Sequence, residues 1–129
     1  MLGKVVHNLL SNDATVIGLV GTNIFPGVMP GDQTGSGIAY VIGSNQNPQT
    51  KEGGSGVTKR AQINISCWGT TYDITQQIAS ACKTAIDDKS GVIESINVRR
   101  VWFENEQDAT WNEKMNLYET AQDYTMNWR

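Results

Sequence analysis

The residues of this sequence best suited to metal or acid-base chemistry are its single histidine and its two cysteines, His7, Cys67 and Cys82. A zinc site assembled from these three would lack a fourth ligand and a closely spaced ligand pair. A catalytic His7 would also need an orienting carboxylate and an oxyanion site. The pattern around both cysteines is apolar, which is typical of small buried thiols and not of a disulfide framework. We therefore expect neither a metal site nor a catalytic residue.

Three alternating carboxylates, Glu104, Glu106 and Asp108, look like the opening of a calcium-binding loop. An EF-hand is excluded, because Ala109 stands where the turn needs glycine and Met115 where the loop needs a bidentate glutamate. The segment is then either a plain solvated loop or a local negative patch that Glu113 would extend.

Glycine and arginine clusters offer two further kinds of site. Gly35-Ser36-Gly37 and Gly53-Gly54-Ser55-Gly56 have the composition of phosphate-binding loops, but neither opens a helix and no Gly-Lys-Ser/Thr follows. Arg99 and Arg100 adjoin Trp102, but neighbouring strand residues point to opposite faces, so the two arginines cannot form one nucleic-acid patch. We expect no bound cofactor.

Four tryptophans are many for a chain with only two phenylalanines. Trp68 falls on the polar side of an alternating strand, where it either meets a partner or covers the sheet beneath a loop. Exposed aromatic side chains are typical of partner surfaces. The four are Trp68, Trp102, Trp111 and Trp128.

Composition sets the class of protein more broadly. The 129 residues predict one compact domain. A net charge of −3 and a pI near 5.0 give no broad attraction to nucleic acid or anionic lipid. The sequence contains no run of 18 apolar residues, and its N-terminus lacks the pattern of a signal peptide, so we expect a protein made in the cytoplasm and not inserted in a membrane.

Periodicity predicts an α+β fold. Helical spacing favours a helix over residues 2–11, and Asn12 or Asp13 could cap a short second turn over 16–20. Ten of the 13 glycines and all three prolines lie within residues 18–56, which predicts loops with short extended pieces at 23–25 and 38–42. Residues 43–57, without an apolar side chain before Val57, are expected to form a flexible excursion.

The second half has the clearest elements. Residues 61–68 alternate as a strand with one apolar face, and Thr70 and Asp73 stand at capping-box spacing before a long helix that should end near 87–89. Residues 93–104 predict a strand buried on two sides, 104–114 a polar loop, and 117–128 a last strand with Tyr124 and Trp128 on one face. This order predicts a mostly antiparallel sheet with helices packed on one side.

Several short segments carry a family resemblance through their order and spacing. The most telling block runs from Arg60 to Asp73, a strand ending in Trp68 before the tyrosine that opens the long helix. The other segments are Leu9-Leu10-Ser11-Asn12-Asp13, Val16, Leu19-Val20-Gly21, Ile24-Phe25-Pro26 and Tyr124-Thr125-Met126-Asn127-Trp128. Taken together, they resemble the phage tail completion family, which includes tail terminators and head-to-tail joining proteins. One departure is Gly35-Ser36-Gly37, where family members often have a proline.

The resemblance implies a non-enzymatic virion protein, a homo-oligomeric and typically hexameric ring at the head-proximal end of the tail. Its partners would be copies of itself, the tail tube protein and a neck or connector protein, with DNA passing through without specific binding. Glu104, Glu106 and Asp108 are predicted to face the lumen, where negative charge would keep DNA from sticking. The predicted subunit or tube interface comprises Trp68, Trp102, Tyr124, Trp128, Asn45, Gln46, Gly53 and Gly54.

Other functions stay open at this point. The nearest alternative is a head-completion or neck adaptor from the same assembly, which the sequence does not separate from a tail terminator. A small enzyme is a further alternative, although no nucleophile with a base is visible. A regulatory binding module is the third.

Overall fold

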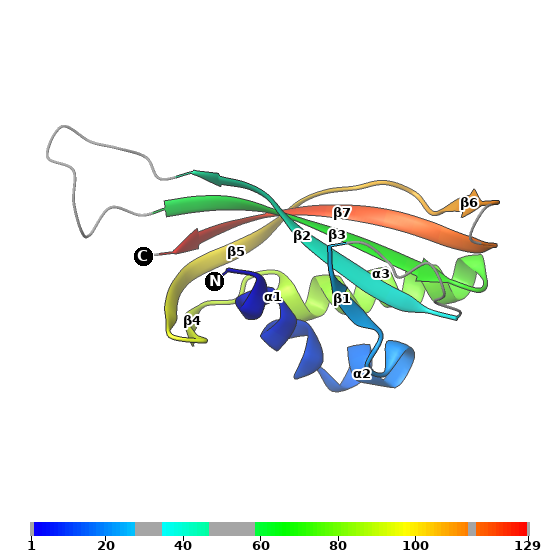
Figure 1. The fold of residues 1–129 in the computed structure, drawn as a ribbon, viewed down its shortest axis with the longest axis horizontal. Coiled ribbons are helices and arrows are strands. Elements are labelled where there is room, and N and C mark those ends of the chain that lie inside the picture. The colour runs from blue at the N-terminus through cyan, green and yellow to red at the C-terminus, as the bar shows by residue number, and fades with distance from the viewer. Residues whose placement is uncertain (1, 28–34, 47–58, 114–115, 129) are drawn as a thin grey trace, which may run out of the picture.

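The computed structural model describes residues 2–27, 35–46, 59–113 and 116–128. They form an α+β fold, as the sequence predicted (Figure 1). The elements in chain order are α1 (Leu2–Ser11), α2 (Ala14–Val20), β1 (Ile24–Pro26), β2 (Gly37–Gln46), β3 (Lys59–Gly69), α3 (Tyr72–Ile86), β4 (Gly91–Ile93), β5 (Ile96–Glu106), β6 (Thr110–Asn112) and β7 (Leu117–Trp128).

The strands build one sheet in the order β1-β2-β3-β7-β5-β4. Neighbouring strands are antiparallel, except that β1 runs parallel to β2. The short β6 pairs with residues 117–119 of β7 on the side where β5 pairs with residues 122–128. All three helices lie on one face of this curled sheet, which confirms the predicted arrangement (Figure 1).

The core lies between the helices and the sheet. On β3 the alternating residues Ala61, Ile63, Ile65 and Cys67 are buried, and α3 buries Ile78, Cys82 and Ile86 against the sheet. The Sγ atoms of the free thiols Cys67 and Cys82 lie 3.6 Å apart in this layer, so both cysteines are in the core as expected.

Side-chain caps fix where two helices begin. Asp13 caps α2 by accepting from the backbone N–H groups of Thr15 and Val16, each at 3.0 Å. Thr71 caps α3 and accepts from the Ile74 N–H at 3.1 Å. The expectation of Thr70 as the cap is therefore wrong by one residue.

The region predicted as one strand over residues 93–104 is a hairpin of β4 and β5. Its turn residues Glu94 and Ser95 both have positive φ, 51° and 65°, as a type I′ turn requires, although such turns usually carry Asn or Gly. A bulge then shifts β5, so that its large apolar residues no longer alternate between faces. Val98, Val101 and Phe103 lie opposite the buried residues Trp128, Met126 and Tyr124.

Only one face of β5 is therefore buried, because the bulge places these three residues on the helix side. The expectation of a strand buried on two sides is wrong. Two other predicted boundaries also change. Part of the predicted polar loop 104–114 is strand, since β5 continues to Glu106 and β6 follows. Residues 43–46 of the predicted excursion belong to β2, and residues 47–58 lie outside the described part of the chain.

Candidate assembly surfaces

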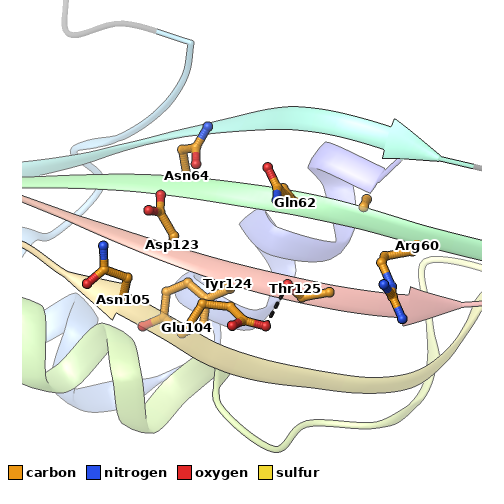
Figure 2. Close-up of a pocket in the computed structure, with 9 residues that line it drawn as sticks. Arg60, Gln62, Asn64, Glu104, Asn105, Asp123, Tyr124 and Thr125 are labelled. Atoms are coloured by element: carbon orange, nitrogen blue, oxygen red, sulfur yellow. Dashed lines mark hydrogen bonds between the residues drawn. The ribbon is translucent and has the colours of Figure 1, made fainter.

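The sheet face opposite the helices carries a polar groove. Because β-strand side chains alternate, β3 and β7 turn Gln62, Asn64, Asp123 and Thr125 away from the core (Figure 2). The groove has a volume of about 460 Å³. Its lining residues are Arg60, Ala61, Gln62, Asn64, Glu104, Asn105, Asp123, Tyr124 and Thr125.

Hydrogen-bonding groups define the chemistry of this groove. The Glu104 carboxylate accepts from Thr125 Oγ1 at 3.0 Å and also from the Trp102 indole N–H (Figure 2). Amide and carboxylate groups on three adjacent strands can bind a polar protein surface. Within residues 2–27, 35–46, 59–113 and 116–128, no three His, Cys, Asp or Glu residues lie close enough to hold a metal ion.

One end of this face is closed by Trp68. Its ring is 3% exposed and stacks on Phe25, with 6.3 Å between centroids and 7° between planes. Ala39 and Leu117 complete the cluster. Gly37 leaves room for the indole, since a Cβ there would lie 2.6 Å from Trp68 Cζ2. The alternative that Trp68 covers the sheet is thus the correct one, and its expected exposure is wrong.

Tyr124 and Trp128 lie on the helix side of β7 and are buried in the core. The Tyr124 hydroxyl donates to Gln122 Oε1 at 2.8 Å, and Gln122 Nε2 donates to the Ala79 carbonyl at 2.8 Å and to Glu106 at 2.7 Å. Burial raises the pKa of Tyr124. The prediction that these aromatic residues share one face is right, but that face is the core, so the exposed interface expected of them is wrong.

The other predicted interface residues have different positions. Trp102 is half-buried, and the Arg100 guanidinium lies 6.0 Å from its ring centroid. Asn45 and Gln46 end β2 in register with Ala61 and Arg60. Gly53 and Gly54 lie outside the described residues.

The three predicted lumen carboxylates do not form one patch. Glu104 and Glu106 belong to β5, and Asp108 lies in the connection to β6. Glu104 accepts from Thr125 on the sheet face opposite the helices, which we call the bare face because no described helix covers it. Glu106 accepts from the buried Gln122 on the helix side. Asp108 accepts from Tyr72 and Gln76 at the start of α3. The β5 bulge between Phe103 and Asn105 separates the first two, because it breaks the alternation that would keep them on one face.

The sheet edges are covered unequally. The chain after α3 covers β5, because the Asp88 N–H donates to the Val101 carbonyl, the Val101 N–H donates to the Lys89 carbonyl and Asp87 accepts from the Phe103 N–H. On the other side, β1 pairs only with residues 38–40, so among the described residues 41–46 of β2 have no strand neighbour there. The outer edge of β4 is likewise open, and its Val92 side chain is 75% exposed.

An exposed aromatic cluster that the sequence-based interface did not include lies at the end of the sheet beside β6. It consists of Tyr72, Trp111 and Tyr118, whose rings meet edge to face. Trp111 was singled out as one of four tryptophans, but it fell in a predicted loop. Tyr72 was noted only as the residue that opens the long helix.

The comparisons with known proteins assign the chain to a family. The chain matches the family model described as Tail completion protein gp17 over residues 4–126, and it belongs to this family. It is therefore a phage tail structural protein of the virion. The comparison with curated proteins gives no match.

The fold is shared with a solved structure. A chain of the virion of a native gene transfer agent (GTA) particle superimposes with a TM-score of 0.78 at 20% sequence identity. The alignment covers 96% of this chain and 91% of the other. Across the described residues, no helix has the length and apolar character needed to cross a membrane.

Proposed function

We propose that copies of this chain form a hexameric ring at the head-proximal end of the tail, where the ring ends tube growth and joins tail to head. The observation that carries the proposal is the family match over residues 4–126, which covers almost the whole domain. A structural role also agrees with the surfaces of the fold: in the described part of the chain, one sheet face carries a polar groove and two strand edges have no neighbouring strand.

A ring with two axial faces needs different surfaces for its different partners. Contacts between neighbouring copies are heterologous, so they join two dissimilar surfaces of the same chain. The tube protein would contact one axial face and a neck or connector protein the other. Glu104 keeps its proposed role in the lumen, because its carboxylate lies on the bare face, whereas Glu106 and Asp108 are held by other elements.

Assembly and partner choice can be measured separately. Native mass spectrometry and negative-stain imaging of the purified protein should give a hexameric ring, either alone or on tube ends. Pull-down should recover tube protein. A strict monomer at high concentration that also fails to bind tube protein contradicts the proposal, and binding only to portal protein would assign the chain to the neck.

A further inference from the structure

The end of the molecule that carries β6 and the start of α3 exposes aromatic rings beside a carboxylate. Trp111 and Tyr72 are 46% and 44% exposed. The Trp111 and Tyr118 rings lie 5.0 Å apart at 66°, and the Tyr118 and Tyr72 rings lie 6.1 Å apart at 85°. We call the set of Tyr72, Asp108, Trp111 and Tyr118 the aromatic corner.

Asp108 is held in a fixed orientation within this corner. Its Oδ1 atom accepts from Tyr72 Oη at 2.8 Å, from Gln76 Nε2 at 3.0 Å and from the Ala109 N–H at 2.8 Å. These donors, Tyr72 first, lower the pKa of Asp108, so its carboxyl is ionised at neutral pH. None of the described residues donates to Oδ2. The corner thus presents a positioned anionic oxygen next to exposed ring faces.

A purely structural role explains only part of this arrangement. The bonds to Oδ1 tie the β5–β6 connection to α3, which accounts for the position of Asp108. They do not require Trp111 and Tyr72 to be exposed, nor do they use Oδ2. Aromatic faces with an adjacent carboxylate are the chemistry that recognises a cation, and arginine suits it best because its planar guanidinium both stacks and donates in pairs.

The two ends of the chain differ in net charge. In residues 69–76 and 106–120, the sequence segments around the aromatic corner, the only basic residue is Lys114. The carboxylates there are Asp73, Glu106, Asp108, Glu113 and Glu119. The opposite end of the long axis carries β4 and the start of β5 (Figure 1). That end carries the acidic residues Asp87, Asp88 and Glu94, and it is net positive because more basic residues lie near it, namely Lys59, Arg60, Lys89, Arg99 and Arg100.

Of the two arginines at the start of β5, Arg99 is the better placed for a partner. Arg100 is already engaged, since its Nε lies 3.3 Å from Asp88 and its guanidinium lies over Trp102. Arg99 is exposed, occupies the β5 bulge and makes no ion pair with any described residue. It therefore has a charge available at the end opposite the acidic one.

We propose that the aromatic corner of one copy binds Arg99 of a second copy. The contact joins opposite ends of the chain, so it is heterologous and can repeat from copy to copy until a ring closes. The complementary charges of the two ends would also orient the approaching copies. This inference rests on the proposed function only in that copies of the chain associate with one another.

Charge reversal on each side of the contact provides the test. Asp108→Lys and Arg99→Glu are each expected to weaken association at least about 30-fold, measured by analytical ultracentrifugation and native mass spectrometry. The double variant should restore it, because the reversed charges then face each other. Mixing the two single variants in equal amounts should give rings in which they alternate, since every contact then joins opposite charges.

Matched controls separate this contact from general charge effects. Glu113→Lys reverses a charge at the same end outside the aromatic corner and should change association less than about 3-fold. Trp111→Ala removes an exposed ring whose nitrogen makes no hydrogen bond with the described residues. It should weaken association while the chain stays folded, with the melting temperature lowered by only several degrees through the lost contact with Tyr118. If Asp108→Lys unfolds the chain, Trp111→Ala and Arg99→Glu still test both sides.

The results of these experiments separate a failure of the proposed Arg99 contact from a failure of the proposed ring. If Trp111→Ala and Arg99→Glu associate like the unaltered protein, the inference is overturned and the proposed ring is untouched. Loss of association in both single charge variants without recovery in the double variant or the mixture also overturns it. A wild-type chain that neither self-associates nor binds tube protein contradicts the proposed function instead.

Discussion

The two faces of the sheet are made by the same strands but contain very different side chains. On β3 the helix side carries Ile63 and Ile65, which are fully buried, and the bare side carries Gln62 and Asn64, which are exposed. One face therefore supplies most of the hydrophobic stabilisation, while the other can vary with little effect on the fold. The polar part of the bare face around Gln62 and Asn64 is therefore not needed for the core.

The strand β7 shows that polarity alone does not distinguish the faces. Gln122 lies on the helix side and is fully buried, yet its amide is satisfied by Ala79, Glu106 and Tyr124. Asp123, the next residue, is exposed on the bare side. The difference between the faces is whether a polar group is satisfied inside the monomer or by solvent and partners.

Substitutions at two adjacent residues of β3, one on each face, should differ most in their effect on the free energy of unfolding. Ile63→Ala removes buried methyl and methylene groups and leaves a cavity, so the free energy of unfolding should fall by about 2 to 5 kcal/mol. Asn64→Ala should change it by about 0.5 kcal/mol or less. Urea unfolding at concentrations where the chain is monomeric measures both, since association would otherwise add to the stability. Equal losses would contradict the division between the two faces.

A smaller contrast is expected on β7. Gln122→Ala leaves the Tyr124 hydroxyl without its acceptor in the core and removes the second hydrogen bond to the Ala79 carbonyl, which keeps its partner within α3. The free energy of unfolding should fall by about 1 to 3 kcal/mol. Asp123→Ala, next to it on the bare side, is the control and should have little effect. The same urea titrations apply, and a harmless Gln122→Ala would mean that water satisfies the Tyr124 hydroxyl.

The smallest effect on stability is expected at Gly37, against which Trp68 packs at one end of the bare face. An added methyl at Gly37 would lie 2.6 Å from Trp68 Cζ2 and 3.1 Å from the Asn23 carbonyl oxygen. Overpacking of this kind costs about 1 to 3 kcal/mol, and about 0.5 to 1 kcal/mol is regained because alanine has less freedom to lose. Gly37→Ala should therefore destabilise the chain by a net amount of up to about 2 kcal/mol, with a change in Trp68 fluorescence. Unchanged fluorescence would argue against this contact.

Regular periodicity made much of the fold predictable from the sequence. The helix over residues 2–11 and the strand over 117–128 were predicted with the bounds found in the structure, because each has a long apolar stripe at one period. The β4–β5 hairpin was missed because Glu94 and Ser95 are unusual residues for its turn. The bulge after Val98 further obscured the pattern, since it shifts the alternation within a single strand.

The candidate surfaces were less predictable, because a strand pattern separates two faces without saying which one the helices cover. Tyr124 and Trp128 were grouped correctly and yet assigned to the surface. Trp68 is buried through contacts with Phe25 and Leu117, which are far from it in sequence. The aromatic corner likewise depends on a contact between residues far apart in sequence, Asp108 and Tyr72, and no local sequence motif predicts that contact.

The packing of α3 on β3 protects two neighbouring thiols from reagents in the solvent. Cys67 and Cys82 are the only thiols of the chain and are fully enclosed, and the pKa of Cys67 is raised by its contact with Cys82 and by burial, which disfavours the reactive thiolate. A copy whose α3 separates from the sheet exposes both thiols together, so that an oxidant such as dissolved oxygen can take their electrons and join them to each other or to those of a neighbouring copy. Tight closure of this layer thus keeps a crowded assembly free of unwanted covalent links.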